Sequence, residues 1–139
     1  MRIFDQDAVN ERLGWSDLIG AIEALFARGA DVPQRQALTI PVPGGEDGTL
    51  LLMPAWLAGD TIGVKAVTFF PGNVAKGLST ISAAYLVFDG NTGAIRAAMD
   101  GDAITVRRTA ATSAAAAKRL ARADARHLLI IGTGQLGPN

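Results

Sequence analysis

The C-terminal part of the sequence contains a glycine pattern typical of nucleotide binding. His127 to Ile131 is predicted to form a short buried strand, and Gly132-Thr133-Gly134-Gln135-Leu136-Gly137 follows at once as a complete G-x-G-x-x-G. Such glycines let the backbone approach a pyrophosphate, whose charge is held by the first N–H groups of the next helix. Because glycine-rich turns also occur without ligands, it is the apolar strand before the pattern that favours dinucleotide binding.

Three basic side chains are further candidates, each with two interpretations. Lys65 lies in a strand pattern of apolar and small residues, where a buried ammonium would require an anion and an edge-strand lysine would reach solvent. Position alone favours the solvent-exposed lysine, and the same ambiguity applies to Arg35 and Arg108. Arg107 and Arg108 are adjacent in a helical pattern, so their side chains point about 100° apart. We expect one of the two to face a site and the other to be solvated.

Other classes of chemistry lack the residues that they need. His127 is the only histidine and cysteine is absent, which leaves almost nothing for Ser-His-Asp or Cys-His catalysis and indicates no metal site. Thirteen Lys and Arg residues balance thirteen Asp and Glu residues, so no basic field attracts nucleic acid or a membrane. No apolar run approaches the roughly 18 residues of a membrane span, and the acidic N-terminus is unlike a signal peptide. We expect a cytoplasmic protein that acts on small molecules.

Two helical patterns come first in the chain. Asp5 to Leu13 has a weak helical period that ends at Gly14, and residues 16 to 28 form a clearer helix with Ser16 as N-cap and Gly29 at its end. The apolar positions of the second helix share one face, so it is expected to lie across a sheet. Isolated aromatic residues such as Tyr85 are interpreted as packing residues.

Five strand patterns follow, separated by loops. They cover Gln36 to Val42, Thr49 to Met53, Thr61 to Phe70, Ile81 to Asp89 and Ala94 to Met99. Pro43 to Gly48 and Gly90 to Gly93 have the composition of hairpin loops. Short connections of this kind predict a largely antiparallel sheet.

An alanine-rich helix connects the sheet to the glycine pattern. Ala103 to Ala121 is almost unbroken helix-forming sequence, with Asp102 as the expected N-cap. We therefore predict an α+β fold with N-terminal helices on the sheet over residues 1–110, a connecting helix and linker over 111–126, and the start of a truncated dinucleotide-binding domain over 127–139. The helix that should follow the glycines is absent from the sequence, so the 139-residue chain is expected to be inactive by itself.

Several segments, taken in order, resemble the ornithine cyclodeaminase/mu-crystallin family. They are Pro33-x-Arg35, Met53-Pro54-Ala55, Gly63-Val64-Lys65-x-Val67, Phe70-Pro71-Gly72-Asn73, Gly77-Leu78-Ser79-Thr80, Phe88-Asp89 with Thr92-Gly93, Asp100-Gly101, Thr105-x-x-Arg108-Thr109-Ala110-Ala111 and Gly132-Thr133-Gly134. The resemblance implies that residues 1–110 bind substrate and form a homodimer through the sheet. It also implies that a Rossmann domain follows and that the cofactor is NAD(P)H.

Residue roles are implied where this sequence matches the family's motifs. Arg35 and Lys65 match positions that hold the substrate carboxylate, for which a guanidinium fork and an ammonium point charge are well suited. Lys65 and Arg108 are the implied catalytic residues. The implied substrate contacts are Arg35, Met53, Lys65 and Arg108, and the implied cofactor contacts are Thr80, Arg108, Gly132, Gly134, Gln135 and Leu136. The family's catalytic aspartate lies in the dinucleotide-binding domain.

Leu51 distinguishes two branches of the family. The cyclodeaminase pattern has a glutamate here, two residues before the Met-Pro pair, where it meets the distal amino group of the substrate. An apolar residue better suits the methylenes of a cyclic imine, and the doubled arginine also resembles the Δ1-pyrroline-2-carboxylate reductase branch. The resemblance thus implies NAD(P)H-dependent reduction of cyclic imino acids, such as Δ1-pyrroline-2-carboxylate to L-proline. The alternatives are an ornithine cyclodeaminase with bound NAD+ and a non-catalytic dimerising or ligand-binding module.

Overall fold

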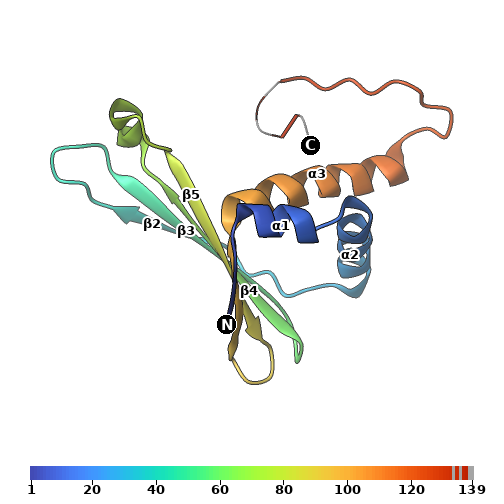
Figure 1. Cartoon of the computed structure of the whole chain (residues 1–139), viewed down its shortest axis with the longest axis horizontal. Coiled ribbons are helices and arrows are strands. Elements are labelled where there is room, and N and C mark those ends of the chain that lie inside the picture. The colour runs from blue at the N-terminus through green and yellow to red at the C-terminus, as the bar shows by residue number, and fades with distance from the viewer. Residues whose placement is uncertain (133, 135, 138–139) are drawn as a thin grey trace.

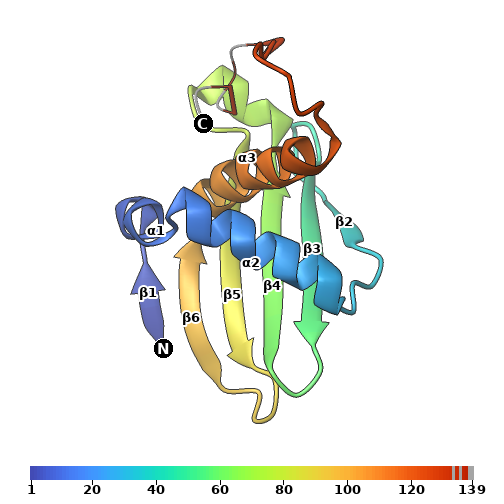
Figure 2. The same ribbon diagram turned by 90° about the vertical axis from the view of Figure 1, so that its right-hand side faces the viewer.

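One sheet carries most of the chain, and the helices lie on one of its faces (Figures 1 and 2). The structure is a computed structural model that describes residues 1–132, 134 and 136–137. In chain order its elements are β1 (Arg2–Phe4), α1 (Gln6–Arg12), α2 (Trp15–Arg28), β2 (Gln36–Ile40), β3 (Gly48–Leu57), β4 (Thr61–Phe69), the 3₁₀ helix η1 (Pro71–Lys76), β5 (Ile81–Asp89), β6 (Ile95–Asp100) and α3 (Gly101–Leu120). No helix among the described residues is long and apolar enough to cross a membrane.

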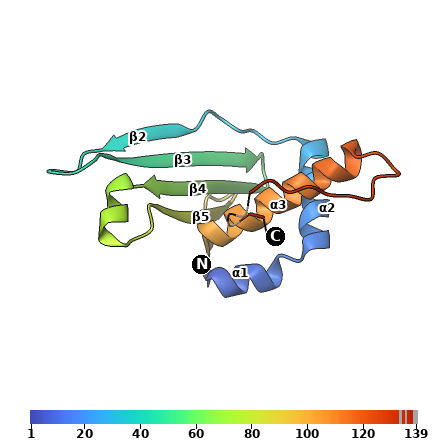
Figure 3. The same ribbon diagram turned by 90° about the horizontal axis from the view of Figure 1, so that it is seen from above.

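The sheet is antiparallel apart from one edge strand, as the hairpin loops predict. Over the described residues the strand order is β1-β6-β5-β4-β3-β2, and only β1 pairs in parallel, with β6. Figure 3 shows β2 at the edge of the sheet far from α1. β1 was not predicted, because a strand of three residues is too short to show a period of two.

β3 runs further than predicted, to Leu57, and passes through Pro54. The backbone of Trp56 exchanges two hydrogen bonds with Asp31, so its N–H points to the side of the sheet on which β2 lies. Pro54 lies two residues before Trp56, so the N–H that it lacks would point to the same side. On that side β2 pairs with β3 only as far as Leu52. The proline therefore removes no hydrogen bond from the sheet.

Two of the predicted N-caps are wrong. α2 begins at Trp15 after Gly14, and Ser16 is already within the helix. α3 is capped by Asp100, whose carboxylate accepts a hydrogen bond of 2.7 Å from the N–H of Ala103, so Asp102 lies in the first turn. The cap moves because β6 passes directly into α3 with no loop between them. Gly29 ends α2 with a φ of 79°, as predicted.

The predicted strand from His127 to Ile131 is wrong for the described structure. Residues 127–132 have no regular structure, and the side chains of Leu128 and Ile131 are 85% and 91% exposed. A strand requires a hydrogen-bonded neighbour, and this segment instead runs beside α3, away from the sheet (Figure 1).

The interior of the molecule is thin, and one face of the sheet is open. The buried apolar side chains are Val9, Ala97, Ala103, Ala111 and Ala115, and none of the large side chains described is fully buried. The chain exposes 9800 Å², whereas a compact monomer of its mass would expose about 6,800 Å². An excess of roughly 3,000 Å² indicates surfaces that pack against something else.

Close packing brings the start of α3 onto β5. A Cβ on Gly101 would lie 2.5 Å from the carbonyl carbon of Ala83, a distance that no side chain tolerates. Because Gly101 has no side chain, the first turn of α3 can rest directly on the sheet. The side chain of Thr105, one turn further along α3, therefore reaches Lys65 on the neighbouring strand β4.

Candidate functional site

One row of side chains crosses the middle of the sheet on the face that the helices cover. Met53, Lys65, Tyr85 and Met99 are direct partners on the successive strands β3, β4, β5 and β6. Such partners lie about 5 Å apart. Arg35 immediately precedes β2, whose last pair at this end is Gln36 with Leu52, so no pairing places Arg35 in this row. The sheet register therefore aligns residues that are far apart in the sequence.

Lys65 does not lie on an edge strand, so the solvent-exposed interpretation fails. β4 lies between β3 and β5, and Lys65 is half-buried. Its Nζ donates a hydrogen bond of 2.5 Å to Oγ1 of Thr105 on α3. Burial and, to a lesser extent, the positive charge of Arg108 lower the pKa of Lys65, and the carboxylate of Asp102 partly opposes them. A desolvated ammonium beside a second cation is well prepared to receive an anion.

The two adjacent arginines have different roles, and neither is simply solvated. Arg108 lines a cavity together with Lys65. Arg107 instead donates from Nε to the carbonyl oxygen of Leu13 at 2.9 Å and also from Nη2 to the same oxygen. Its guanidinium lies 4.2 Å from the ring centre of Trp15. Arg107 therefore holds the junction of α1 and α2 against α3.

Replacing Arg107 with leucine is expected to lower the free energy of unfolding by about 2 kcal/mol, because the carbonyl of Leu13 and the ring of Trp15 both lose a cationic partner. Urea denaturation of the purified chain measures this change. Arg122→Leu is the control, since that arginine is 84% exposed and, in the described part of the chain, pairs only with the nearby Asp124. Equal stability of the two variants would contradict the structural role of Arg107.

The cavity that contains the two cations lies between α2, α3 and the sheet, and measures about 800 Å³. Leu18, Ile22, Leu25 and Phe26 of α2 form one wall, with Tyr85 and Met99 of the sheet and Ile104 of α3 opposite. Among the described residues that line it there is no aspartate or glutamate. The cavity therefore suits a ligand with one anionic group and an apolar body.

Tyr85 belongs to this site, although the sequence indicated only packing. A Cβ on Gly63 would lie 2.1 Å from the hydroxyl oxygen of Tyr85, so the glycine provides the space for the phenol. Burial raises the pKa of Tyr85, which keeps the hydroxyl protonated as a donor. The signal for Tyr85 is its pairing with Lys65, which depends on register.

Not every candidate residue reaches the cavity. Arg35, Met53 and Thr80 are absent from its described lining, and Arg35 is exposed. Thr80 lies between η1 and β5, where its carbonyl oxygen accepts a hydrogen bond of 2.8 Å from the N–H of Phe70. The described residues contain no cluster of three His, Cys, Asp or Glu side chains that could hold a metal ion.

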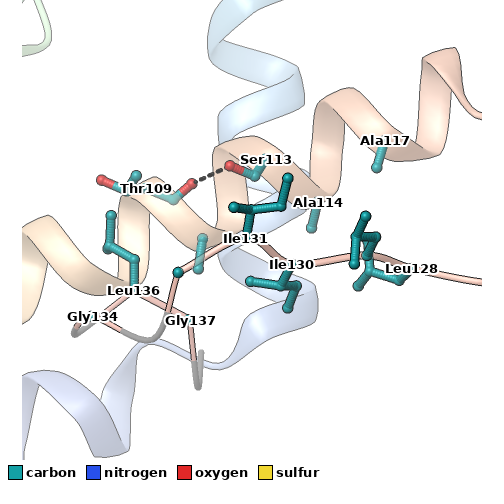
Figure 4. Close-up of a pocket in the computed structure, with 13 residues that line it drawn as sticks. Thr109, Ser113, Ala114, Ala117, Leu128, Ile130, Ile131, Gly134, Leu136 and Gly137 are labelled. Carbon is teal, nitrogen blue, oxygen red and sulfur yellow. Dashed lines mark hydrogen bonds between the residues drawn. The ribbon is translucent and has the colours of Figure 1, made fainter.

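A second cavity, of about 700 Å³, separates α3 from the C-terminal segment (Figure 4). Its lining includes Gly132, Gly134 and Leu136, opposite Thr109 and Ser113 of α3. The prediction for Gln135 lies outside the described residues. Because Arg108 lines the first cavity and Thr109 the second, α3 is a wall shared by both.

The fold and the site define the class of α+β domains that carry a cation pair between a sheet and a helix, ahead of a glycine-rich segment. Within that class the chain belongs to the ornithine cyclodeaminase/mu-crystallin family, whose model matches residues 2–137. The α+β fold is shared with solved structures of dinucleotide-dependent dehydrogenases and reductases.

Three relatives illustrate the similarity. The chain is 43% identical over 123 residues to the Δ1-pyrroline-2-carboxylate reductase of Paracoccus denitrificans, which covers 88% of the chain and 37% of the relative. The structure of the Thermococcus litoralis Δ1-pyrroline-2-carboxylate reductase in complex with NADH and L-proline matches with a TM-score of 0.72 and 32% identity, over 89% of this chain and 39% of that one. An archaeal alanine dehydrogenase dimer with bound NAD matches with a TM-score of 0.74 and 35% identity, over 89% of this chain and 38% of that one. The chain spans about 40% of the length of these relatives.

Proposed function

We propose that the full-length protein containing this chain reduces cyclic imino acids, such as Δ1-pyrroline-2-carboxylate to L-proline, with NAD(P)H. The observation that carries this proposal is the meeting of Lys65 and Arg108 in one largely apolar cavity. Their combined charge is complementary to a carboxylate, and the apolar walls are complementary to ring methylenes. The similarity to reductases of this substrate supports the same activity.

The surroundings of Leu51 favour the reductase over a cyclodeaminase. Leu51 pairs with Ala37 on β2 and Val67 on β4, so its direct neighbours across the sheet are apolar. The described lining of the cavity also contains no carboxylate that could pair with a distal ammonium. Burying such an ammonium without a partner would be strongly unfavourable. An uncharged ring avoids this penalty.

Two described glycines of the glycine-rich segment are compatible with a dinucleotide, although residues 127–131 before them do not form the expected strand. Gly132 has a φ of 104°, which favours glycine, and a Cβ on Gly134 would meet open space. Gly132, Gly134, Gln135 and Leu136 would hold the pyrophosphate, and Thr80 and Arg108 would lie toward the nicotinamide. When bound, the cofactor supplies the hydride that reduces the C=N carbon.

The residues of this chain bind and orient the substrate. The Arg108 guanidinium offers a planar fork of donors from α3, and the Lys65 ammonium adds donors from β4. Together they fix the carboxylate, which leaves the ring against the apolar wall of α2. Arg35, which immediately precedes β2, is proposed as a third cation for the same carboxylate. Most of the rate enhancement is expected to come from this positioning.

The decisive experiment is an assay of the full-length protein with two substrates. Consumption of NAD(P)H with Δ1-pyrroline-2-carboxylate is the expected result. Release of ammonia from L-ornithine without net change of the cofactor would instead identify a cyclodeaminase. Binding of either compound with no turnover under any cofactor would leave a ligand-binding module and overturn the proposal.

We also propose that the protein forms a homodimer through the open face of the sheet. By strand alternation, the side chains opposite to Lys65 on this face include Leu52, Pro54, Val64, Ala66 and Leu86. The excess of exposed surface supports a partner on this apolar face, and one solved relative is described as a dimer.

Val64→Arg is expected to convert the dimer to a monomer, because it places a charge in the centre of the proposed interface. Light scattering of the full-length protein measures the mass of each form. Ala116→Arg introduces the same side chain at an exposed position of α3 and should leave the dimer intact. A monomeric wild type would contradict the proposal.

A further inference from the structure

We propose that Thr105 is a positioning residue that fixes the Lys65 ammonium beside Arg108. This inference rests on the proposed function, because its consequence for catalysis requires a carboxylate substrate. Within the described residues, Thr105 is the only hydrogen-bond partner of the Lys65 side chain, although the two residues are 40 positions apart. The contact therefore exists only because α3 crosses β4.

The hydroxyl of Thr105 has a fixed orientation. Its Oγ1 donates to the carbonyl oxygen of Gly101 at 2.5 Å, which uses its only proton. Only its lone pairs remain for Lys65, so the lysine must be the donor in the contact between them. An ammonium has three N–H donors, and Thr105 engages one. The other two stay available for a ligand in the cavity.

The position of Thr105 on α3 also sets the spacing of the two cations. Thr105 and Arg108 are three residues apart on one helix, so they lie on the same face. Like charges repel, and besides the carboxylate of Asp102, which attracts the ammonium without a hydrogen bond to it, only Thr105 holds Lys65 toward α3 among the described contacts. The hydroxyl thus offsets the repulsion that would otherwise turn the lysine away from Arg108.

The charged groups around Lys65 give the direction of a pH effect. On α3, the positive charge of Arg108 disfavours the charged form of Lys65, and the negative charge of Asp102 favours it. Tyr85 faces Lys65 from β5 as a neutral phenol. On β3 the partner is the uncharged Met53, and the described residues of α2 that line the cavity are apolar. Loss of an acceptor for the ammonium therefore lowers the pKa of Lys65 further. Lys65 would then lose its charge at a lower pH, and the affinity of the site for a carboxylate would decrease there.

The test compares Thr105→Val, which keeps the shape, with Thr105→Ser, which keeps the hydroxyl. In the full-length protein, Thr105→Val is expected to raise KM for Δ1-pyrroline-2-carboxylate about tenfold, with kcat within about twofold. The alkaline limb of kcat/KM should move to lower pH. Thr105→Ser should restore both values. Unchanged KM and pH profile in an active Thr105→Val enzyme would overturn the inference.

A second measurement needs no turnover. The ¹³Cε signal of Lys65, assigned by Lys65→Arg, reports the titration of its amine by NMR. We expect a lower pKa in Thr105→Val and the wild-type pKa in Thr105→Ser. Thr109→Val removes an equivalent hydroxyl bond one turn later, to the carbonyl of Thr105, and should leave the lysine titration unchanged. If this pattern appears in a protein that does not reduce imino acids, the positioning role stands and the proposed function fails. An identical titration in every variant would refute the role of Thr105.

Discussion

Replacing Arg108 with alanine in the full-length protein is expected to raise KM for the cyclic imino acid by about a hundredfold. The estimate follows from the loss of a charged, two-pronged contact to a carboxylate in an apolar cavity, which contributes roughly 3 kcal/mol. Steady-state kinetics with Δ1-pyrroline-2-carboxylate measure the change. Arg122→Ala, at an exposed arginine near the end of α3, is the matched control and should behave as wild type.

Lys65→Ala provides a second arm of the same experiment. It should also raise KM strongly, and the double variant with Arg108→Ala should lose more than the two single losses combined. Each cation disfavours the other, so removal of one relieves the repulsion on its neighbour. An unchanged KM in both single variants would remove the pair from the substrate site.

The largest effect on stability is expected for Gly101→Ala, which should lower the free energy of unfolding by about 3 kcal/mol or prevent folding. The added Cβ would meet backbone atoms of Ala83 and Ala84 at 2.5 and 2.6 Å, and backbone cannot turn aside as a side chain can. The cause is purely steric, since alanine is otherwise the better helix former.

Gly20→Ala is the matched control for this prediction. Gly20 is also helical, but a Cβ there would meet nothing within 4 Å, so the substitution should stabilise α2 by up to about 1 kcal/mol. Urea denaturation of the two variants compares them directly. Wild-type stability in Gly101→Ala would show that α3 does not rest on β5 as described.

The elements of the sheet could be predicted because hairpin loops and strand periods are local signals. The errors arose where the local signal was incomplete. The cap of α3 depends on how β6 ends, and the strand predicted at His127 needed a hydrogen-bonded neighbour that the described residues do not provide. Periodicity detects the apolar run but not its partner.

The site was less predictable than the fold, because the environment of a cation depends on contacts between distant residues. Lys65 could be distinguished from an edge lysine only once the strand order was known. Arg107 was expected in solvent, yet its acceptor is Leu13, which lies 94 positions away. No sequence window includes both residues. The helical separation of Arg107 and Arg108 was a local property, and it correctly indicated that only one would face the cavity.

The row that joins Met53, Lys65, Tyr85 and Met99 has a consequence for how this family tolerates change in chain length. One inserted or deleted residue within β4 would preserve the hydrogen bonds of the sheet but turn Lys65 to the open face. The chain could still fold after such a change, but Lys65 would no longer reach the cavity proposed to bind the substrate. Natural length variation is therefore expected in loops such as Pro43 to Gly48 and to be excluded between Gly63 and Lys65, even where stability alone would permit it.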